Sequence, residues 1–441
     1  MSTSPYSPND VYIVAARRSP VGRLCGGLSQ LSAHQLGAQV IKAVLSDCIN
    51  NVEDPAHLKQ SILDHMAEVI VGQVFTAGAG QNPARQAAVL AGIPYSVPAW
   101  SLNMLCGSGL QSVCLAFDRL KSNEKKDGWF LAGGQESMSQ AIYAFPPNAS
   151  VTARCTRGRA VEEWIKSGDI CLVDLLMHDG LCDPLSELAM GQTAEIVAKK
   201  FKITRAQQDE FAFESHQKYA KAYENGYFGA EVVPIELPTA PQSENMPPKF
   251  VTKDEHPRPE TTIEVLGKLK LAFTDADGQG TVTAGNASGL NDGAAFVLMC
   301  SGTQLNTYAD SVKPLVKILG WHQVGLEPHL MSLGPVDAVR GVLRKVGWTL
   351  DSVDLFEINE AFAAQALAVM KELEIPRSKF NIVGGGIALG HPLGCSGARV
   401  LVTLVHQLSR LRRSTGKVLR GVAALCVGGG MGIAMAVETC G

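Results

Sequence analysis

The sequence predicts an α/β protein that is built from two similar halves. Three observations support this fold class. Short apolar segments alternate with longer stretches of helical pattern, the same order of segments returns after about residue 310, and glycine-rich turns follow the apolar segments in both halves. Alternation of this kind is typical of α/β folds, and its recurrence indicates an internal duplication.

In the first half, four apolar segments are predicted as strands: residues 10–16, 67–74, 100–104 and 128–132. A helix is predicted from near Pro83, and a second one follows the turn at residues 106–110. The last of these strands ends in Gly133 and Gly134. The order is therefore strand, helix, strand, glycine-containing turn, helix and strand.

The second half repeats this order with strands at residues 315–320, 353–358, 380–383 and 419–425. Helices are expected from Glu360 and after His391, and glycine runs occupy residues 384–386 and 428–430. Open α/β sheets bind ligands at the carboxyl ends of their strands. We therefore expect catalytic residues at corresponding strand ends of the two halves.

A segment of different composition separates the halves. It contains a helical stretch at residues 189–227 and a polar, proline-rich loop at residues 238–259. We interpret it as an excursion that covers a substrate, and a purely structural insertion is the alternative. The predicted division is a first half at 1–138, a loop domain at 139–285, a return to the first half at 286–309 and a second half at 310–441.

Composition excludes several classes of protein. Hydrophobic residues make up 46% of the 441 residues and charged residues 18%, which predicts a large core and not disorder. The net charge of −3 argues against a nucleic-acid-binding protein, which would carry an excess of positive charge. The apolar run at residues 422–437 holds four glycines and is too short for a membrane span, which needs about 20 residues. No signal or transit peptide is evident at the N-terminus, so we expect a soluble protein.

The cysteines indicate free thiols. There are 11 of them, and none form a C-x-x-C pair, which argues against a zinc ribbon or a thioredoxin-type site. No metal site is predicted. Free thiols are typical of a reducing compartment, here the cytoplasm or the matrix of mitochondria or peroxisomes.

Cys106 is a candidate nucleophile. It follows a predicted strand and starts a predicted helix, within the sequence NMLCGSG at residues 103–109. A helix N-terminus lowers the pKa of a thiol because its free N–H groups and macrodipole favour the thiolate. The flanking glycines let a ligand approach the sulfur closely. The alternative is a small buried residue.

His391 and Cys426 occupy turns in the second half. His391 lies in GHPLG at residues 390–394, where an imidazole can take a thiol proton or donate to an oxyanion, although a structural histidine is the alternative. Cys426 enters a glycine turn at a strand end, and we interpret its position as matching that of Cys106. A disulfide would suggest secretion, which nothing else supports. One nucleophile and one acid/base is the better interpretation.

Asn359 follows the predicted strand at residues 353–358 and begins the sequence Asn-Glu-Ala-Phe. Its amide is able to hold a water molecule or a carbonyl oxygen. Asparagine is also among the preferred residues for capping a helix, and that reading is the alternative at this position.

Together, these clusters resemble the motifs of the thiolase family, C-x-S, N-E-A-F, G-H-P and C-x-G, in the family's order. In this chain they read Cys106–Ser108, Asn359–Phe362, Gly390–Pro392 and Cys426–Gly428. The resemblance extends through residues 17–22, 133–138 and 283–293 and covers about residues 10–438. It implies duplicated βαβαβαββ halves layered α/β/α/β/α, with an inserted loop domain.

The resemblance also implies a mechanism. Cys106 takes an acyl group from an acyl-CoA, His391 accepts the thiol proton, and Cys426 exchanges a proton with the methyl group of acetyl-CoA. One oxyanion hole comprises His391 and a water held by Asn359, and the other comprises the backbone N–H groups of Cys106 and Gly428. The reaction is a ping-pong acyl transfer, which runs as cleavage in fatty acid β-oxidation and as condensation in lipid synthesis.

No tightly bound cofactor is implied, because coenzyme A and acyl-CoA are substrates. Residues at the family's coenzyme A and acyl positions are Met190, Arg258, Ala284, Ser288, Met331, Ala361 and Phe362. Arg258 is expected near the nucleotide phosphates, with a solvated loop charge as the alternative. Ser288 is expected at the pantetheine, and Met331 in the acyl pocket, where core packing is the alternative. By resemblance, we also expect a homodimer or homotetramer.

Two departures from the family pattern concern the substrate. Acetoacetyl-specific members usually carry histidine before the methionine–glycine of the covering loop, where this chain has Ala189. The loss of an imidazole opens the pocket to longer 3-ketoacyl chains or alters coenzyme A binding, so an acetoacetyl-CoA-specific biosynthetic enzyme is kept as an alternative. Residues 142–170 also exceed what shorter bacterial members need, and we interpret them as an insertion rather than a membrane or partner contact.

Other classes fit less well. Ketoacyl synthases share the fold but use one cysteine with two histidines, so Cys426 argues against them. A thiolase-like protein that only binds acyl-CoA would not need all four intact motifs. A dinucleotide-binding enzyme is disfavoured because no G-x-G-x-x-G follows the first strand.

Overall fold

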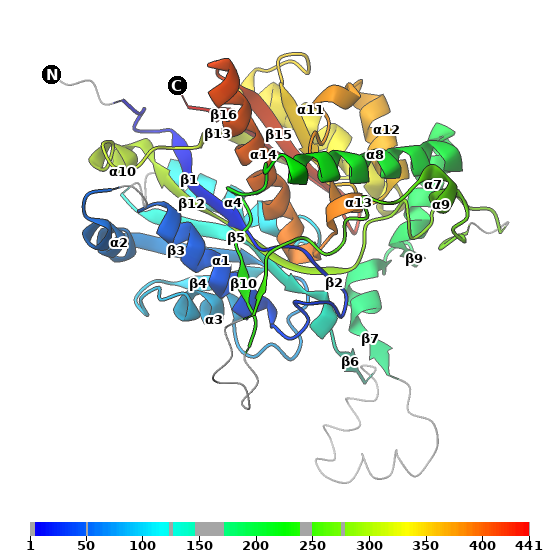
Figure 1. Cartoon of the computed structure of the whole chain (residues 1–441), viewed down its shortest axis with the longest axis horizontal. Helices are drawn as coiled ribbons and strands as arrows, with labels where there is room; N and C mark the ends of the chain where they lie inside the picture. The colour runs from blue at the N-terminus through cyan, green and yellow to red at the C-terminus, as the bar shows by residue number, and fades with distance from the viewer. Residues whose placement is uncertain are drawn as a thin grey trace, which may run out of the picture.

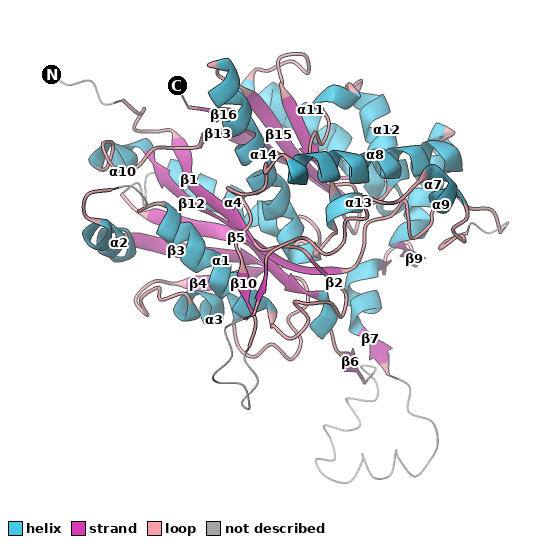
Figure 2. Ribbon diagram, in the orientation of Figure 1, coloured by secondary structure: helices cyan, strands magenta, loops and turns pink. Residues whose placement is uncertain are grey.

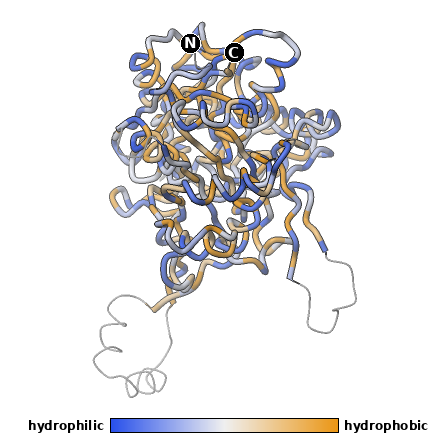
Figure 3. The backbone as a smooth tube through the Cα atoms, turned by 90° about the vertical axis from the view of Figure 1, so that its left-hand side faces the viewer, coloured by the Kyte–Doolittle hydropathy of each residue, from blue (hydrophilic) through white to orange (hydrophobic). Residues whose placement is uncertain are grey.

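The computed structural model shows strands of both halves joined in one mixed sheet, with helices on either side (Figures 1 and 2). It describes residues 5–49, 52–122, 127–145, 172–238, 249–274 and 278–440. Tyr6 and Cys440 pack in the same apolar cluster, so the described ends of the chain lie together at one end of the molecule (Figure 3). Most of residues 142–170, the predicted insertion, lie outside the described residues.

The first half contributes strands in the order β4-β3-β5-β12-β1. Their bounds are β1 Val11–Arg18, β3 Met66–Gly72, β4 Ala99–Leu102, β5 Trp129–Ser137 and β12 Asn291–Ser301. β3 runs parallel to β4 and β5, whereas β12 is antiparallel to both β5 and β1. A short strand, β2 (Gly22–Arg23), pairs with β12.

The second half repeats this pattern in the order β14-β15-β16-β13. The bounds are β13 Val316–Gly325, β14 Leu355–Ile358, β15 Arg420–Val427 and β16 Met431–Thr439. β14 and β15 are parallel, and β16 is antiparallel to both of its neighbours. Three residue pairs between β1 and β13 join the halves. In both halves, the last strand inserts between the first strand and a parallel pair, which confirms the predicted duplication.

The helices form three layers around these strands. In the middle, α4 (Ser108–Lys121) and α14 (Leu393–Thr415) share one apolar cluster with strands of both halves. The outer face of the first half is covered by α1 (Ala33–Asp47), α2 (Pro55–Asp64) and α3 (Pro83–Leu90). The outer face of the second half is covered by α11 (Gly334–Val346) and α12 (Ala363–Leu373). This is the predicted α/β/α/β/α layering.

The middle segment lies mainly against the second half. α7 (Met190–Phe201) and α8 (Arg205–Glu224) pack on α12, and α8 also contacts α13 (Gly386–Leu389), as Figure 1 shows.

The remaining short elements of the chain are η1 Met138–Gln140, β6 Tyr143–Ala144, β7 Val173–Asp174, η2 Met177–Leu181, β8 Cys182–Asp183, β9 Leu188–Ala189, β10 Ile235–Glu236, β11 Phe250–Val251, α9 Ile263–Gly267, α10 Gly302–Thr307, η3 Pro328–Leu333 and η4 Arg377–Lys379. The division into four sequence ranges stays a prediction.

The strand predictions missed two long strands and included one strand that does not form. β12 and β16 were not predicted, because each begins among glycine and polar residues that read as a turn. Residues 380–383 do not form a strand and are reduced to one bridge between Phe356 and Phe380. Asn381 has a φ of 42°, and this left-handed conformation ends the extended chain directly after the bridge.

The two central helices touch backbone to backbone. A Cβ added to Gly109 of α4 would lie 2.7 Å from the Ala398 nitrogen and 2.9 Å from the Gly394 oxygen. A Cβ added to Gly397 of α14 would lie 2.3 Å from the Leu110 nitrogen. Glycine at this crossing therefore lets the N-terminal ends of both helices approach one site.

We expect Gly109→Ala to destabilise the protein by about 1–3 kcal/mol, because overpacking at this backbone contact outweighs the better helix propensity of alanine, about 1 kcal/mol. Thermal unfolding followed by circular dichroism measures the change. Gly267→Ala is the matched control, since a Cβ there meets nothing within 4 Å. Equal melting temperatures for the two variants would contradict the prediction.

Candidate active site

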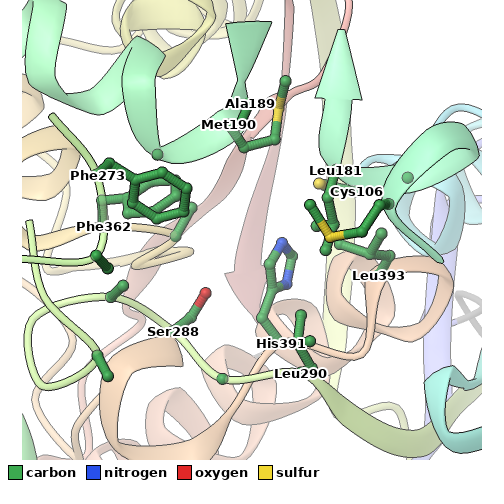
Figure 4. A pocket seen from close by; sticks show the side chains of 18 of the residues that line it. Cys106, Leu181, Ala189, Met190, Phe273, Ser288, Leu290, Phe362, His391 and Leu393 are labelled. Atoms are coloured by element: carbon green, nitrogen blue, oxygen red, sulfur yellow. The ribbon is translucent and has the colours of Figure 1, made fainter. Parts of the chain in front are cut away.

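One cavity of about 280 Å³ collects most of the predicted site residues. Cys106, His391 and Cys426 all line it, although they come from a turn before α4, a turn before α14 and the end of β15. Figure 4 shows Cys106 and His391 in this cavity, with Phe273 and Phe362 on one side and Leu181 and Leu393 on the other. The structure therefore brings both thiols and the imidazole together.

A tight turn holds Cys106 directly before the N-terminal end of α4. Leu105 has a φ of 47°, and the Ser108 hydroxyl bridges the turn by accepting from the Met104 N–H at 2.8 Å and donating to the Leu105 carbonyl at 2.7 Å. No side chain caps α4 at Gly107. A Cβ on Gly107 would lie 2.9 Å from Val427, so this turn packs directly on the end of β15.

The expected low pKa of the Cys106 thiol is wrong. Burial raises its pKa to about 11, although backbone N–H groups of Gly428 and of Cys106 itself lower it, and the nearby Glu136 carboxylate adds to the rise. The helix N-terminus is thus outweighed by desolvation of the charged form. At neutral pH Cys106 is a thiol, and it needs a base to become a nucleophile.

This state of Cys106 sets the pH dependence of its alkylation. Because iodoacetamide reacts with the thiolate, we expect the alkylation rate to rise about tenfold per pH unit between pH ~7 and ~9. The rise follows from a thiolate fraction that increases up to the pKa of about 11. Mass spectrometry of the Cys106 peptide measures the rate. A plateau near neutral pH would show a preformed thiolate and contradict the prediction.

Cys426 is 1% exposed and packs with Met331 and Ala361. Burial raises the pKa of its thiol, and the neighbouring Cys106 raises it further. Both cysteines are free thiols. The two do not occupy matching positions, because Cys106 lies between a strand and a helix, whereas Cys426 lies in β15, which turns directly into β16. The residue that matches Cys106 is His391, since both precede a central helix.

His391 is buried and neutral. Burial lowers the pKa of its imidazole to about 3, and the positive charge of Arg399 acts in the same direction. Its backbone N–H donates to Asn291 Oδ1 at 3.0 Å, and its Nδ1 lies 2.6 Å from Ser396 Oγ. A neutral imidazole at this position is able to accept a proton.

Asn359 does not cap a helix, because the N-cap of α12 is Phe362. Its amide is fully buried, with Nδ2 at 3.3 and 3.4 Å from the two ring nitrogens of His391. Arg399 donates to Asn359 Oδ1 at 3.3 Å and is paired with Glu357 at 2.8 Å. The capping alternative is therefore wrong, and the amide belongs to the surroundings of His391.

Six of the seven predicted coenzyme A and acyl residues line the same cavity: Met190, Ala284, Ser288, Met331, Ala361 and Phe362. The Ser288 N–H donates to the Ala361 carbonyl at 2.9 Å, which fastens two of the predicted segments together. Arg258 does not line the cavity; it is exposed, and its backbone N–H donates to His216 Nδ1 at 3.2 Å. Gly428 is buried beside Cys106 and offers its backbone N–H there.

Several apolar residues of the cavity were not singled out from the sequence: Met138, Met177, Leu181, Phe273, Leu290 and Leu393. Met138, Leu290 and Leu393 belong to the glycine-rich motifs at residues 133–138, 283–293 and 390–394, so the sequence gives a reason to expect them near the site. No motif in the sequence indicates that Phe273 or η2 lies there. In the described part of the chain, no three histidine, cysteine or acidic side chains gather as metal ligands would. None of its helices is long and apolar enough to cross a membrane.

The fold and the site define a class of enzyme. Two thiols and a neutral imidazole face one largely apolar cavity at the N-terminal ends of paired central helices, as in acyltransferases that work through an acyl-cysteine. The family model for the thiolase N-terminal domain matches residues 11–303, and the model for the thiolase C-terminal domain matches residues 312–439. The chain belongs to the thiolase family.

Individual relatives agree along the full length. The cytosolic acetyl-CoA acetyltransferase of Rattus norvegicus is 44% identical over 428 residues, which are 97% of this chain and 98% of that protein. The acetyl-CoA acetyltransferase of Pseudomonas aeruginosa is 45% identical over 428 residues, with the same coverage. The crystal structure of human mitochondrial 3-ketoacyl-CoA thiolase superimposes with a TM-score of 0.84 at 37% identity, covering 99% of this chain and all of that one.

Proposed function

We propose that this thiolase catalyses the reversible, coenzyme A-dependent cleavage of 3-ketoacyl-CoA, and in reverse the Claisen condensation of acetyl-CoA with an acyl-CoA. The observation that carries the proposal is the shared cavity of Cys106, His391 and Cys426. Two sulfurs and one base are what a ping-pong transfer requires, because one thiol carries the acyl group while the other moves a proton.

In the cleavage direction, the Cys106 sulfur attacks the 3-keto carbon and His391 takes the thiol proton. The bond between C2 and C3 breaks, and Cys426 gives its proton to the departing acetyl-CoA enolate. His391 then passes its proton back to Cys426. As the sulfur of free coenzyme A attacks the acyl-cysteine, His391 takes the coenzyme A thiol proton and gives it to the Cys106 sulfur, whose bond to the acyl carbon breaks. Burial disfavours a separated thiolate–imidazolium pair in the resting site, so proton transfer is coupled to attack.

Two groups of donors stabilise the oxyanions of this reaction. The backbone N–H groups of Cys106 and Gly428 already point at the thiol, where the acyl oxygen of the first intermediate develops. His391, together with a water on Asn359, forms the second group at the thioester oxygen of the enolate. Such preorganised donors contribute several kcal/mol in a site from which water is excluded.

Coenzyme A reaches the cavity along residues of the middle segment. Ser288 and Ala284 are placed to accompany the pantetheine arm, and Met190 and Phe362 flank its path. The exposed Arg258 is assigned to the nucleotide phosphates outside the cavity. Coenzyme A is a substrate in this scheme, and no cofactor is retained between turnovers. The free thiols suit a reducing compartment, and a homodimer or homotetramer is the proposed assembly.

The acyl specificity follows from the apolar walls. Ala189 lines the cavity where an imidazole would fill space, while Met331 narrows it beside Cys426. We therefore propose short 3-ketoacyl chains, with acetoacetyl-CoA as one substrate and not the sole one. An enzyme specific for acetoacetyl-CoA is the second candidate, which the cytosolic relative favours.

The test follows loss of the enolate absorbance of acetoacetyl-CoA after addition of free coenzyme A. A series of 3-ketoacyl-CoA substrates of increasing chain length then separates the two candidates by kcat/KM. Cleavage of acetoacetyl-CoA and the next longer chains at comparable efficiency is the expected result. Activity with acetoacetyl-CoA alone would select the specific enzyme, and no cleavage of any chain would refute the function.

A further inference from the structure

We propose that Ser396 is a positioning residue, whose hydroxyl accepts a hydrogen bond from Nδ1–H of His391 and so keeps Nε2 unprotonated, as the ring nitrogen that takes the thiol proton. The inference deepens the proposed function, because it rests on the roles given to Cys106 and His391. Ser396 lies in the first turn of α14, five residues after His391, and is fully buried.

The hydrogen bonds around the hydroxyl support this direction. Ser396 Oγ lies 2.6 Å from His391 Nδ1 and 2.8 Å from the Pro392 carbonyl oxygen, to which it donates. A hydroxyl has one proton and two lone pairs. Because the Ser396 O–H donates to the Pro392 carbonyl, the hydroxyl oxygen offers a lone pair to the imidazole ring. The bond at 2.6 Å is then donated by Nδ1–H.

The neighbouring amide has no acceptor to offer the ring. The Arg399 guanidinium carries only donors and binds Asn359 Oδ1, so the Nδ2 group of Asn359 is the one turned to His391. This donor lies 3.3 Å from Nδ1 and 3.4 Å from Nε2, and it donates to whichever ring nitrogen carries no proton. Within the described part of the chain, Ser396 is thus the acceptor that is hydrogen-bonded to the imidazole. A neutral histidine has a single N–H, and placing it on Nδ1 makes Nε2 the base.

The same bond survives the chemical step. When Nε2 takes the thiol proton, the imidazolium still donates through Nδ1 to Ser396, so no reorganisation is needed. Without the hydroxyl, Nδ1–H loses its buried partner, and the tautomer with a protonated Nε2 becomes competitive. That tautomer is unable to accept a proton from Cys106.

The experiment measures acetylation of Cys106 by acetyl-CoA in a single turnover, by rapid quench and intact-protein mass spectrometry. Ser396→Ala is expected to slow acetylation by at least about tenfold, a part of the ~10²–10⁴-fold that a general base contributes. In the His391→Ala background, Ser396→Ala is expected to cause no further loss, because the two residues act as one unit. Additive losses would overturn the proposal.

Two controls separate positioning from damage to the fold. Ser112→Ala removes a fully buried hydroxyl of α4 that donates to Gly109 and Gly133 carbonyls, and it is expected to keep the wild-type rate. Alkylation of Cys106 by iodoacetamide uses thiolate formed by bulk pH, so it is expected to be unchanged in Ser396→Ala. Equal slowing of alkylation and acetylation would show a structural role instead.

If alanine disturbs packing by leaving a void, Ser396→Cys fills the position with a somewhat larger thiol that supplies only a weak acceptor. It is expected to reproduce the slow acetylation with normal alkylation of Cys106. Wild-type acetylation in this variant would overturn the proposal. Failure of the wild-type enzyme to acetylate Cys106 at all would instead refute the proposed function, so the two failures are distinguishable.

Discussion

Replacing Cys106 with alanine is expected to lower kcat for acetoacetyl-CoA cleavage by at least ~10⁴-fold, which is the scale seen when a nucleophile is removed from a covalent mechanism. Cys426 is the other described cysteine that lines the cavity, and it is not expected to substitute, because it is packed against Met331 and Ala361 and its own proton is needed in the reaction. The assay follows the enolate absorbance. Intact mass after incubation with acetyl-CoA is expected to show no acetyl-enzyme.

Cys25→Ala is the control for this variant. Cys25 is an exposed free thiol on the loop after β2, and it does not line the cavity. Its loss is expected to leave both kcat and the acetylated mass unchanged. Cleavage by Cys106→Ala at the rate of the wild type would show that the nucleophile has been misassigned, and the mechanism proposed above would fail with it.

Cys426→Ala is expected to separate the two halves of the reaction. Acetylation of Cys106 and exchange of free coenzyme A into acetyl-CoA need only Cys106 and His391, so they continue. Cleavage and condensation both move a proton at the methyl carbon of acetyl-CoA, and they are expected to fall by about 10³-fold, within the range for general acid–base catalysis. The ratio of the exchange rate to the cleavage rate is the measurement.

Cys395→Ala is the matched control, because Cys395 is equally buried on α14 but does not line the cavity. It is expected to cost some stability and to keep the exchange-to-cleavage ratio. If Cys426→Ala instead lost exchange and cleavage to the same extent, Cys426 would be needed for acylation itself, and the division of labour between the thiols would be wrong.

That Cys106 and His391 lie in turns directly before helices was predictable because both lie in local patterns. An apolar run, a glycine turn and a helical stretch are encoded within about 20 neighbouring residues. The duplication was visible for the same reason, since each half repeats these patterns. The hidden strands β12 and β16 lacked such a signal, because glycine and polar residues at their starts imitate a turn.

The chemical state of the site was not predictable in this way. A helix N-terminus suggested an acidic thiol, but the pKa of Cys106 is high because α14, β15 and the middle segment together remove water from it. Asn359 resembled a helix cap until Arg399 and His391, brought in by α14, were seen to hold its amide. Arg258 was placed at coenzyme A by resemblance, yet the cavity does not reach it.

The order of residues along the chain thus specified which side chains carry the chemistry and which turns present them, since backbone geometry at a turn depends on its own few residues. Packing between distant segments decided how those side chains behave. Desolvation, hydrogen bonding and the separation of charges depend on atoms from segments far apart in the sequence, as with the glycine crossing of α4 and α14 and the Arg399 guanidinium that binds the Asn359 amide.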